Sequence, residues 1–153
     1  MTRPTSDRVR ENAFNLVGPV DGADGIDLFA GSGALGLEAL SRGAARMTFV
    51  EADREACRTI DANLEQLGLH ATVLCQDVAR ALAQERRDYD LVLCDPPYDY
   101  DLGRIAGDLA KLVRTAGVLV LESTSRAEPP GLDGLVVRTS RTYGAARLTL
   151  YEA

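Results

Sequence analysis

Residues 25–36 read GIDLFAGSGALG, and this stretch decides the fold class. The apolar run Gly25–Phe29 predicts a short buried strand, and the glycine-rich turn Ala30–Gly36 follows it. A helix is then expected to run to Arg42 and to stop at Gly43. The turn matches the pattern G-x-G-x-x-G, in which backbone N–H groups can approach a ligand at the start of a helix. The pattern alone is compatible with NAD, FAD or another nucleoside cofactor, and also with a tight turn that binds nothing.

Outward from this stretch, the chain alternates between strand and helix patterns. Further strands are expected at 47–50, 71–75, 89–94, 117–122, 135–142 and 147–151, and helices at 6–17, 54–67 (capped by Asp53), 78–82 and about 102–113. Nearly continuous apolar strands need cover on both faces, so we predict a Rossmann-like α/β fold with a mostly parallel, seven-stranded sheet. The last two strands, joined across Tyr143-Gly144, are expected to form an antiparallel hairpin. Residues 1–153 are predicted to form a single domain.

The composition fits a globular domain without a disulfide or metal requirement. The chain has 153 residues, 46% of them hydrophobic, and a domain of this size buries roughly 70% of its unfolded surface. Cys57, Cys75 and Cys94 lack the spacing of a zinc site, so we expect buried free thiols and a reducing cytoplasm. No long apolar segment or basic leader is present, which predicts a cytoplasmic protein with no membrane partner.

The charge restricts how the chain could meet a nucleic acid. The net charge is -6 and the pI is about 4.8, which argues against coating a nucleic acid with the whole surface. A nucleic-acid partner would have to be bound by a local basic patch.

Acidic residues stand at the ends of the second and third predicted strands. The Glu51 carboxylate could accept hydrogen bonds from two ribose hydroxyls, or it could be a solvated acid before a helix. Asp77 could accept from the N6 amine of an adenine. It could equally cap the helix at 78–82, and the two roles are compatible.

The tetrad Asp95-Pro96-Pro97-Tyr98 follows the fourth predicted strand directly. Two prolines fix two φ angles and remove two backbone donors, so the turn is rigid and its carbonyls point outward. Asp95 and the Pro96 carbonyl can then accept both hydrogens of an amino group that is conjugated with a planar system. Tyr98 offers a face for base stacking, which contributes roughly 1–3 kcal/mol. The tetrad therefore indicates methyl transfer to such an amine by positioning and electrostatics, although a strand-terminating proline turn is the plain alternative.

With these residues in place, the sequence resembles the RsmD family of methyltransferases, which modify guanine N2 in 16S ribosomal RNA. The resemblance rests on residues 2–11 (TRPTSDRVRE) with Phe14-Asn15, on residues 27–43 (DLFAGSGALGLEALSRG), on the tetrad and on Tyr143-Gly144. It implies a class I methyltransferase fold with S-adenosylmethionine as the cofactor. It also implies a partner, either 16S rRNA or the assembling small ribosomal subunit, and no metal.

The resemblance assigns expected roles to individual residues. The cofactor would be bound by Asp27, Phe29, Ala30, Gly31, Ser32, Gly33, Glu51 and Asp77, and the guanine by Asp95, Pro96, Pro97 and Tyr98. Residues 1–18 would cover the cleft, so Arg3, Thr5, Arg8 and Arg10 are candidates for contacts with RNA phosphates or the cofactor carboxylate. A solvated amphipathic helix would explain the same residues. Family members usually begin with a basic β-hairpin, whereas this sequence starts at Met1-Thr2-Arg3, a difference that bears on RNA binding more than on cofactor binding.

Several other functions stay open at this point. A DNA amino-methyltransferase would share the tetrad and flip its target base, but usually carries a separate recognition domain. A protein-glutamine methyltransferase normally has Asn in place of Asp95. Two further alternatives are a cofactor-binding module that is inactive on RNA and a nicotinamide-dependent oxidoreductase. A monomer is expected.

Overall fold

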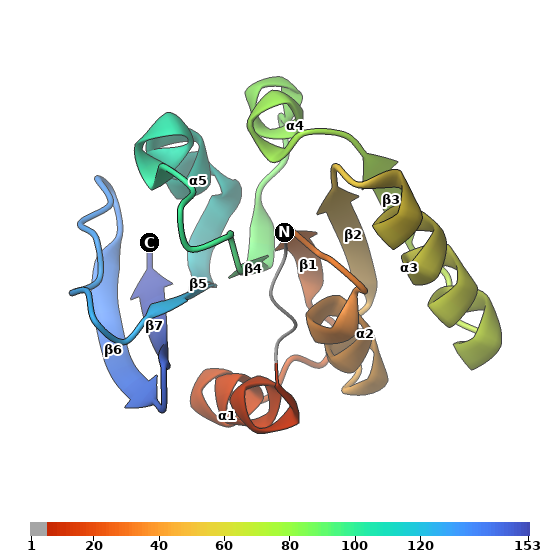
Figure 1. Ribbon diagram of the computed structural model, residues 1–153, viewed down its shortest axis with the longest axis horizontal. Helices are drawn as coiled ribbons and strands as arrows, with labels where there is room; N and C mark the ends of the chain where they lie inside the picture. Colours follow the sequence, from red (N-terminus) through yellow and green to blue (C-terminus); the bar gives the residue numbers. More distant parts are fainter. Residues whose placement is uncertain (1–5) are drawn as a thin grey trace.

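The computed structural model describes residues 6–153, which form a seven-stranded sheet with helices on both faces (Figure 1). The strands are β1 (Asp24–Leu28), β2 (Arg46–Glu51), β3 (Thr72–Cys75), β4 (Tyr89–Cys94), β5 (Val113–Thr124), β6 (Val136–Tyr143) and β7 (Ala146–Glu152). The helices are α1 (Asp7–Val17), α2 (Ala34–Ser41), α3 (Arg54–Leu67), α4 (Val78–Gln84) and α5 (Ala106–Leu112), with a 3-10 turn, η1, at Leu102–Arg104.

The order of the strands is β3-β2-β1-β4-β5-β7-β6. Strands β1 to β5 are parallel, and β7 runs antiparallel to both β5 and β6. This confirms the mostly parallel sheet and the antiparallel hairpin that the sequence predicts. The order of the strands reverses between β1 and β4, and ligands of open α/β sheets bind at the carboxyl ends of the strands at such a switch point.

Two layers of helices cover the sheet because successive strand residues point to opposite faces. Leu91 and Leu93 of β4 pack in one core cluster with α1, α2 and α3. Val92 and Cys94 of the same strand pack in a second cluster with α4 and α5. Figure 1 shows α4 and α5 above the sheet and α1 and α2 below it, with α3 beside β3 at the right. Among residues 6–153, no helix is long and apolar enough to cross a membrane.

Local capping explains why the helices begin where they do. The Asp53 carboxylate accepts from the Ala56 N–H at 2.9 Å, as predicted for the start of α3. Ser6 caps α1 in the same way, with its hydroxyl accepting from the Val9 N–H at 3.2 Å. Gly68 ends α3 in the left-handed region, with a φ of 68°.

Three expectations from the sequence are wrong. The helix predicted at 102–113 is divided into η1 and α5, and β5 begins at Val113 instead of at 117. The reason is a register shift in the pairing of β5 with β4, where Ala116 has a φ of 68°. The irregularity interrupts the alternating pattern by which a strand is recognised. Cys57 and Cys94 are buried as expected, but Cys75 is exposed.

Candidate active site

The fold places the glycine-rich turn and the tetrad at the same edge of the sheet. Leu28 at the end of β1 pairs with Cys94 at the end of β4. The next residues, Phe29 and Asp95, therefore leave adjacent strands at the same level, and the Asp95 N–H donates to the Leu28 carbonyl at 3.5 Å. The two motifs, far apart in the sequence, meet at the switch point of the sheet.

The turn after β1 has an unusual backbone. Phe29 has a φ of 59°, and Gly31 and Gly33 have φ values of 59° and 85°. A positive φ is uncommon for an aromatic residue, and such strain tends to occur at functional sites. A Cβ at Gly33 would lie 3.2 Å from Ile60, whereas a Cβ at Gly31 would meet nothing within 4 Å. The turn is thus packed on the core at one end and open at the other.

Glu51 holds this turn from the end of β2. Its side chain is 6% exposed, so the interpretation of Glu51 as a solvated acid is wrong. One carboxylate oxygen accepts from the Gly31 N–H at 2.8 Å and the other from the Asp53 N–H at 2.9 Å. Since each oxygen has two acceptor sites, the fixed carboxylate retains the capacity to accept from hydroxyl groups of a ligand.

A second contact to the turn comes from α3. The Asn63 side-chain amide donates to the Ser32 carbonyl at 3.2 Å. The glycine-rich turn is therefore held by β2 on one side and by α3 on the other. Nothing in the local sequence indicates this role for Asn63, because the contact joins segments 31 residues apart.

Asp77 is exposed at the end of β3. Its carboxylate accepts from the Arg80 N–H at 3.1 Å, which confirms the cap of α4. The contact with an adenine stays a prediction.

Asp27 lies beneath the turn and is 1% exposed. Its carboxylate accepts from the Gly36 N–H at 3.0 Å and so anchors the first turn of α2. Burial raises the pKa of Asp27 well above its usual value, the Gly36 hydrogen bond opposes this shift, and the nearby charges of Asp95 and Glu51 add to it. The contacts of Asp27 given by the structure are internal, and its expected cofactor contact stays a prediction.

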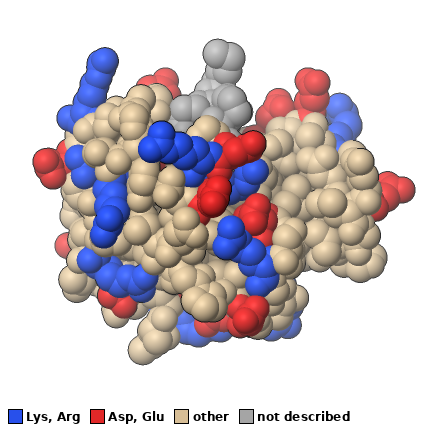
Figure 2. All heavy atoms as spheres, turned by 90° about the horizontal axis from the view of Figure 1, so that it is seen from below, with Lys and Arg blue, Asp and Glu red and all other residues tan. Residues whose placement is uncertain are grey.

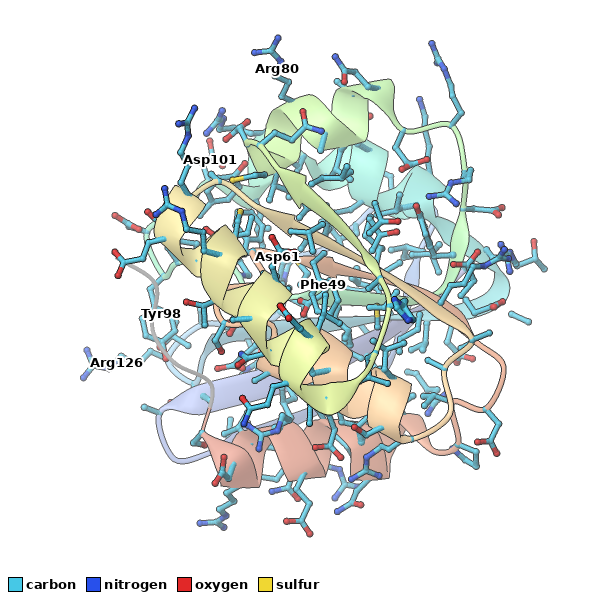
Figure 3. The ribbon with its side chains drawn as sticks, turned by 90° about the vertical axis from the view of Figure 1, so that its right-hand side faces the viewer. Phe49, Asp61, Arg80, Tyr98, Asp101 and Arg126 are labelled. Atoms are coloured by element: carbon cyan, nitrogen blue, oxygen red, sulfur yellow. The ribbon has the colours of Figure 1, made fainter. Side chains whose placement is uncertain are left out.

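The tetrad forms a rigid turn at the edge of β4. Pro96 is buried and Asp95 is half-buried, while Tyr98 is 53% exposed. The Pro97 carbonyl accepts from the Tyr100 N–H at 3.0 Å, which closes the turn. Figure 3 shows Tyr98 at the left edge of the molecule, beyond the strands. An exposed ring beside a fixed acceptor is an arrangement that suits a planar base.

Tyr100, which the sequence did not indicate as a candidate, contacts the glycine-rich turn through Phe29. Its ring meets the Phe29 ring edge-on, with centroids 4.8 Å apart and an interplanar angle of 68°. The Arg104 guanidinium lies over the Tyr100 ring, 5.4 Å from its centroid. This aromatic pair links the turn after β1 to the segment after the tetrad. The sequence signal that could have indicated Tyr100 is the presence of an aromatic residue two positions after the tetrad.

The predicted basic contacts of the N-terminal segment are only partly described. Arg3 and Thr5 lie outside the described residues. Arg8 is exposed on α1. Arg10 forms ion pairs with Asp7 at 2.9 Å and with Glu38 of α2 at 3.5 Å. The guanidinium of Arg10 therefore joins α1 to α2, and contacts of Arg8 or Arg10 with a ligand stay predictions.

Comparison with known proteins agrees with this architecture. The protein yhhF of Escherichia coli, whose structure is named as a methyltransferase, superposes with a TM-score of 0.86. It is 35% identical, and the match covers 98% of this chain and 86% of that chain. The fold is that of the class I methyltransferases.

Proteins of similar sequence are also named as methyltransferases. A Bacillus subtilis (strain 168) protein named as an rRNA methyltransferase, YlbH, is 40% identical over 99% of this chain and 88% of its own length. Ribosomal RNA small subunit methyltransferase D of Escherichia coli (strain K12) is 47% identical over 63% of this chain and 50% of its own length.

The family match covers nearly the whole chain. The family described as Conserved hypothetical protein 95 matches residues 1–152. S-adenosylmethionine is the cofactor of these enzymes, and the chemistry of the turn and of Glu51 fits it. The chain therefore belongs to this family, the RsmD family of methyltransferases.

Proposed function

We propose that the protein transfers a methyl group from S-adenosylmethionine to the exocyclic N2 of a guanine in 16S ribosomal RNA. The observation that carries the proposal is the juxtaposition of the glycine-rich turn with Asp95 across the β1–β4 switch point. In this arrangement the cofactor would lie along Phe29–Gly33, with Glu51 on its ribose and Asp77 on its adenine. The target base would stack on Tyr98.

The tetrad residues suit an amine of low nucleophilicity. The N2 lone pair of guanine is delocalised into the ring, so the amine must be turned toward pyramidal geometry before it can attack. Asp95 and the Pro96 carbonyl would accept its two hydrogens and direct the lone pair at the methyl group. Because the cofactor supplies an activated methyl on a sulfonium, the protein contributes orientation and electrostatic stabilisation without a covalent intermediate.

The names of the relatives support an RNA substrate for this chemistry. One is named as an rRNA methyltransferase and another as a small-subunit rRNA methyltransferase. The chain spans about half the length of the second relative, 50% of it. The choice of guanine N2, the small-subunit substrate and a cytoplasmic location are parts of the proposal.

The test is methylation of small ribosomal subunits, and separately of naked 16S rRNA, that lack the modification. Labelled nucleosides would be identified by mass spectrometry. We expect N2-methylguanosine. Methylation of DNA bases alone would overturn the substrate, and saturable binding of NAD without binding of S-adenosylmethionine would overturn the function. Cofactor binding without turnover on either RNA would indicate an inactive module.

A matched pair of variants tests the reaction centre. Asp95→Ala is expected to abolish turnover while calorimetry shows cofactor affinity close to that of the wild type. Asp61→Ala removes an exposed carboxylate on α3, away from the tetrad (Figure 3), and is expected to retain activity. Near-normal turnover of Asp95→Ala would refute the role of this carboxylate.

A further inference from the structure

The basic residues of this acidic chain are unevenly distributed. Figure 2 shows Lys and Arg side chains concentrated toward the left of the face seen from below, which is the side of β6 and β7. Strand β6 (VVRTSRTY) contains two arginines and no acidic residue. Arg126, in the loop after β5, and Arg141, near the end of β6, are both exposed. Neither forms an ion pair with any residue of 6–153.

These two arginines lie at the edge of the sheet that carries the tetrad. Since β7 is antiparallel to both β5 and β6, the carboxyl end of β6 lies at the same edge as that of β5. Leu121 of β5 pairs with Cys94 of β4, so Arg126 and Tyr98 follow adjacent strands a few residues after this pair. Figure 3 shows Tyr98 and Arg126 at the same left-hand edge.

The loop that carries Arg126 is fastened to the hairpin. The Arg147 guanidinium donates to the Ala127 carbonyl at 2.9 Å, and the Ser125 N–H donates to the Ala145 carbonyl at 2.9 Å. Further along the loop, the Tyr151 hydroxyl donates to the Pro130 carbonyl at 2.7 Å. A loop held at three points loses little conformational freedom when a ligand binds, which favours affinity.

We propose that Arg126 and Arg141 form a docking surface for the RNA backbone and bind phosphates on the strand that carries the target base. This inference rests on the proposed function. Guanidinium groups match phosphate oxygens in a bidentate geometry. Both arginines are exposed near the edge of the sheet at which Tyr98, the residue on which the base would stack, follows β4. A base can stack on Tyr98 only when it is unstacked from its neighbours, so the RNA would be a single-stranded loop or bulge. Arg147 acts as a positioning residue because it holds the Arg126 loop.

The surface accounts for RNA binding by a chain with a net charge of -6. A local patch on one side of the catalytic edge can contact the backbone while the acidic remainder stays away from it. Each phosphate contact that is lost lowers the slope of log affinity against log salt by about 0.7 for single strands. Removal of both arginines should therefore lower this slope by roughly 1.4.

The test compares two double variants of equal charge change. Arg126→Glu with Arg141→Glu alters the docking surface. The control, Arg80→Glu with Arg86→Glu, alters exposed arginines in and just after α4. Figure 3 shows Arg80 at the top of the view, away from Tyr98 and Arg126. For the 16S rRNA substrate, the first variant should raise KM and Kd about tenfold or more and reduce the salt slope. Its affinity for S-adenosylhomocysteine should equal that of the wild type, and the control should resemble the wild type in every measurement.

The outcomes separate this inference from the proposed function. If the wild type methylates RNA and both double variants bind RNA equally well, the docking surface is refuted and the function stands. If the wild type binds RNA without methylating it, the function fails, and the difference in salt slope still decides the docking surface. Absence of RNA binding by the wild type would overturn both. Arg126→Lys with Arg141→Lys should retain the salt slope and lose only part of the affinity, because the charge remains.

Discussion

The third glycine of the G-x-G-x-x-G pattern offers a sharp test of how the turn is built. Gly36 lies in the first turn of α2, directly over Phe49 of β2. A Cβ at this position would lie 2.4 Å from Cε2 and 2.9 Å from Cζ of the Phe49 ring, and 3.0 Å from an Asp27 carboxylate oxygen. The ring has 0% exposure, so it cannot swing into solvent. Gly36→Ala therefore forces a displacement inside the core.

The size of the effect follows from two opposing contributions. Carbon atoms in contact prefer about 3.5–4.0 Å, and an overpacked core costs typically 1–3 kcal/mol. The contact at Gly36 is short and fully buried, so we take the destabilisation caused by overpacking as about 3 kcal/mol. Alanine recovers about 1 kcal/mol of helix propensity, which leaves a net destabilisation of about 2 kcal/mol. At about 2–4 °C per kcal/mol for a chain of this size, the Tm should fall by about 4–8 °C.

Gly107→Ala is the matched control. Gly107 is also helical, in α5, but a Cβ there meets nothing within 4 Å. The same gain in helix propensity is then unopposed, and the Tm should rise by about 2–4 °C. Thermal unfolding followed by circular dichroism measures both variants. A Tm of Gly36→Ala equal to or above that of the wild type would refute the argument that close packing requires glycine here.

Two further predictions concern the acids that organise the turns. Asp53→Ala removes the cap of α3 and should lower the free energy of unfolding by about 1 kcal/mol. Urea denaturation measures this loss, and the m value should stay unchanged. The control, Asp61→Ala on the same helix, should have little effect on the free energy of unfolding. Burial raises the pKa of Asp27, so the folded state binds a proton more tightly than the unfolded state. The free energy of unfolding should then fall as pH rises from the ordinary aspartate pKa toward the raised one. Asp27→Asn removes this dependence, so the stability of the variant relative to the wild type should grow with pH, and a constant difference would contradict the raised pKa.

Much of the fold could be predicted because its signals are local. The strand at Tyr89–Cys94 was predicted with the bounds that the structure has. The Asp53 cap and the Gly68 stop of α3 involve residues within a few positions of each other, so a short stretch of sequence contains all the interacting groups. The same holds for the tetrad, whose rigidity comes from the two prolines themselves.

The prediction failed where distant segments determine the local conformation. The start of β5 depends on an irregular pairing with Tyr89 in β4, which no pattern within residues 113–117 contains. The exposure of Cys75 likewise depends on tertiary structure, because β3 is the edge strand and Cys75 is its last residue. The contact of its sulfur with the Cys57 thiol of α3 covers Cys75 only in part.

The sequence by itself determined the fold class and the family, and it predicted the chemistry that we propose for the tetrad, because motifs and periodicity are properties of neighbouring residues. Only the tertiary structure decided that both Glu51 oxygens hold backbone N–H groups, that Tyr100 packs on Phe29, and that Arg126 and Tyr98 share an edge. The physical reason is that these contacts depend on the register of parallel strands. Register is set by packing across the whole sheet, and no single segment of the chain encodes it.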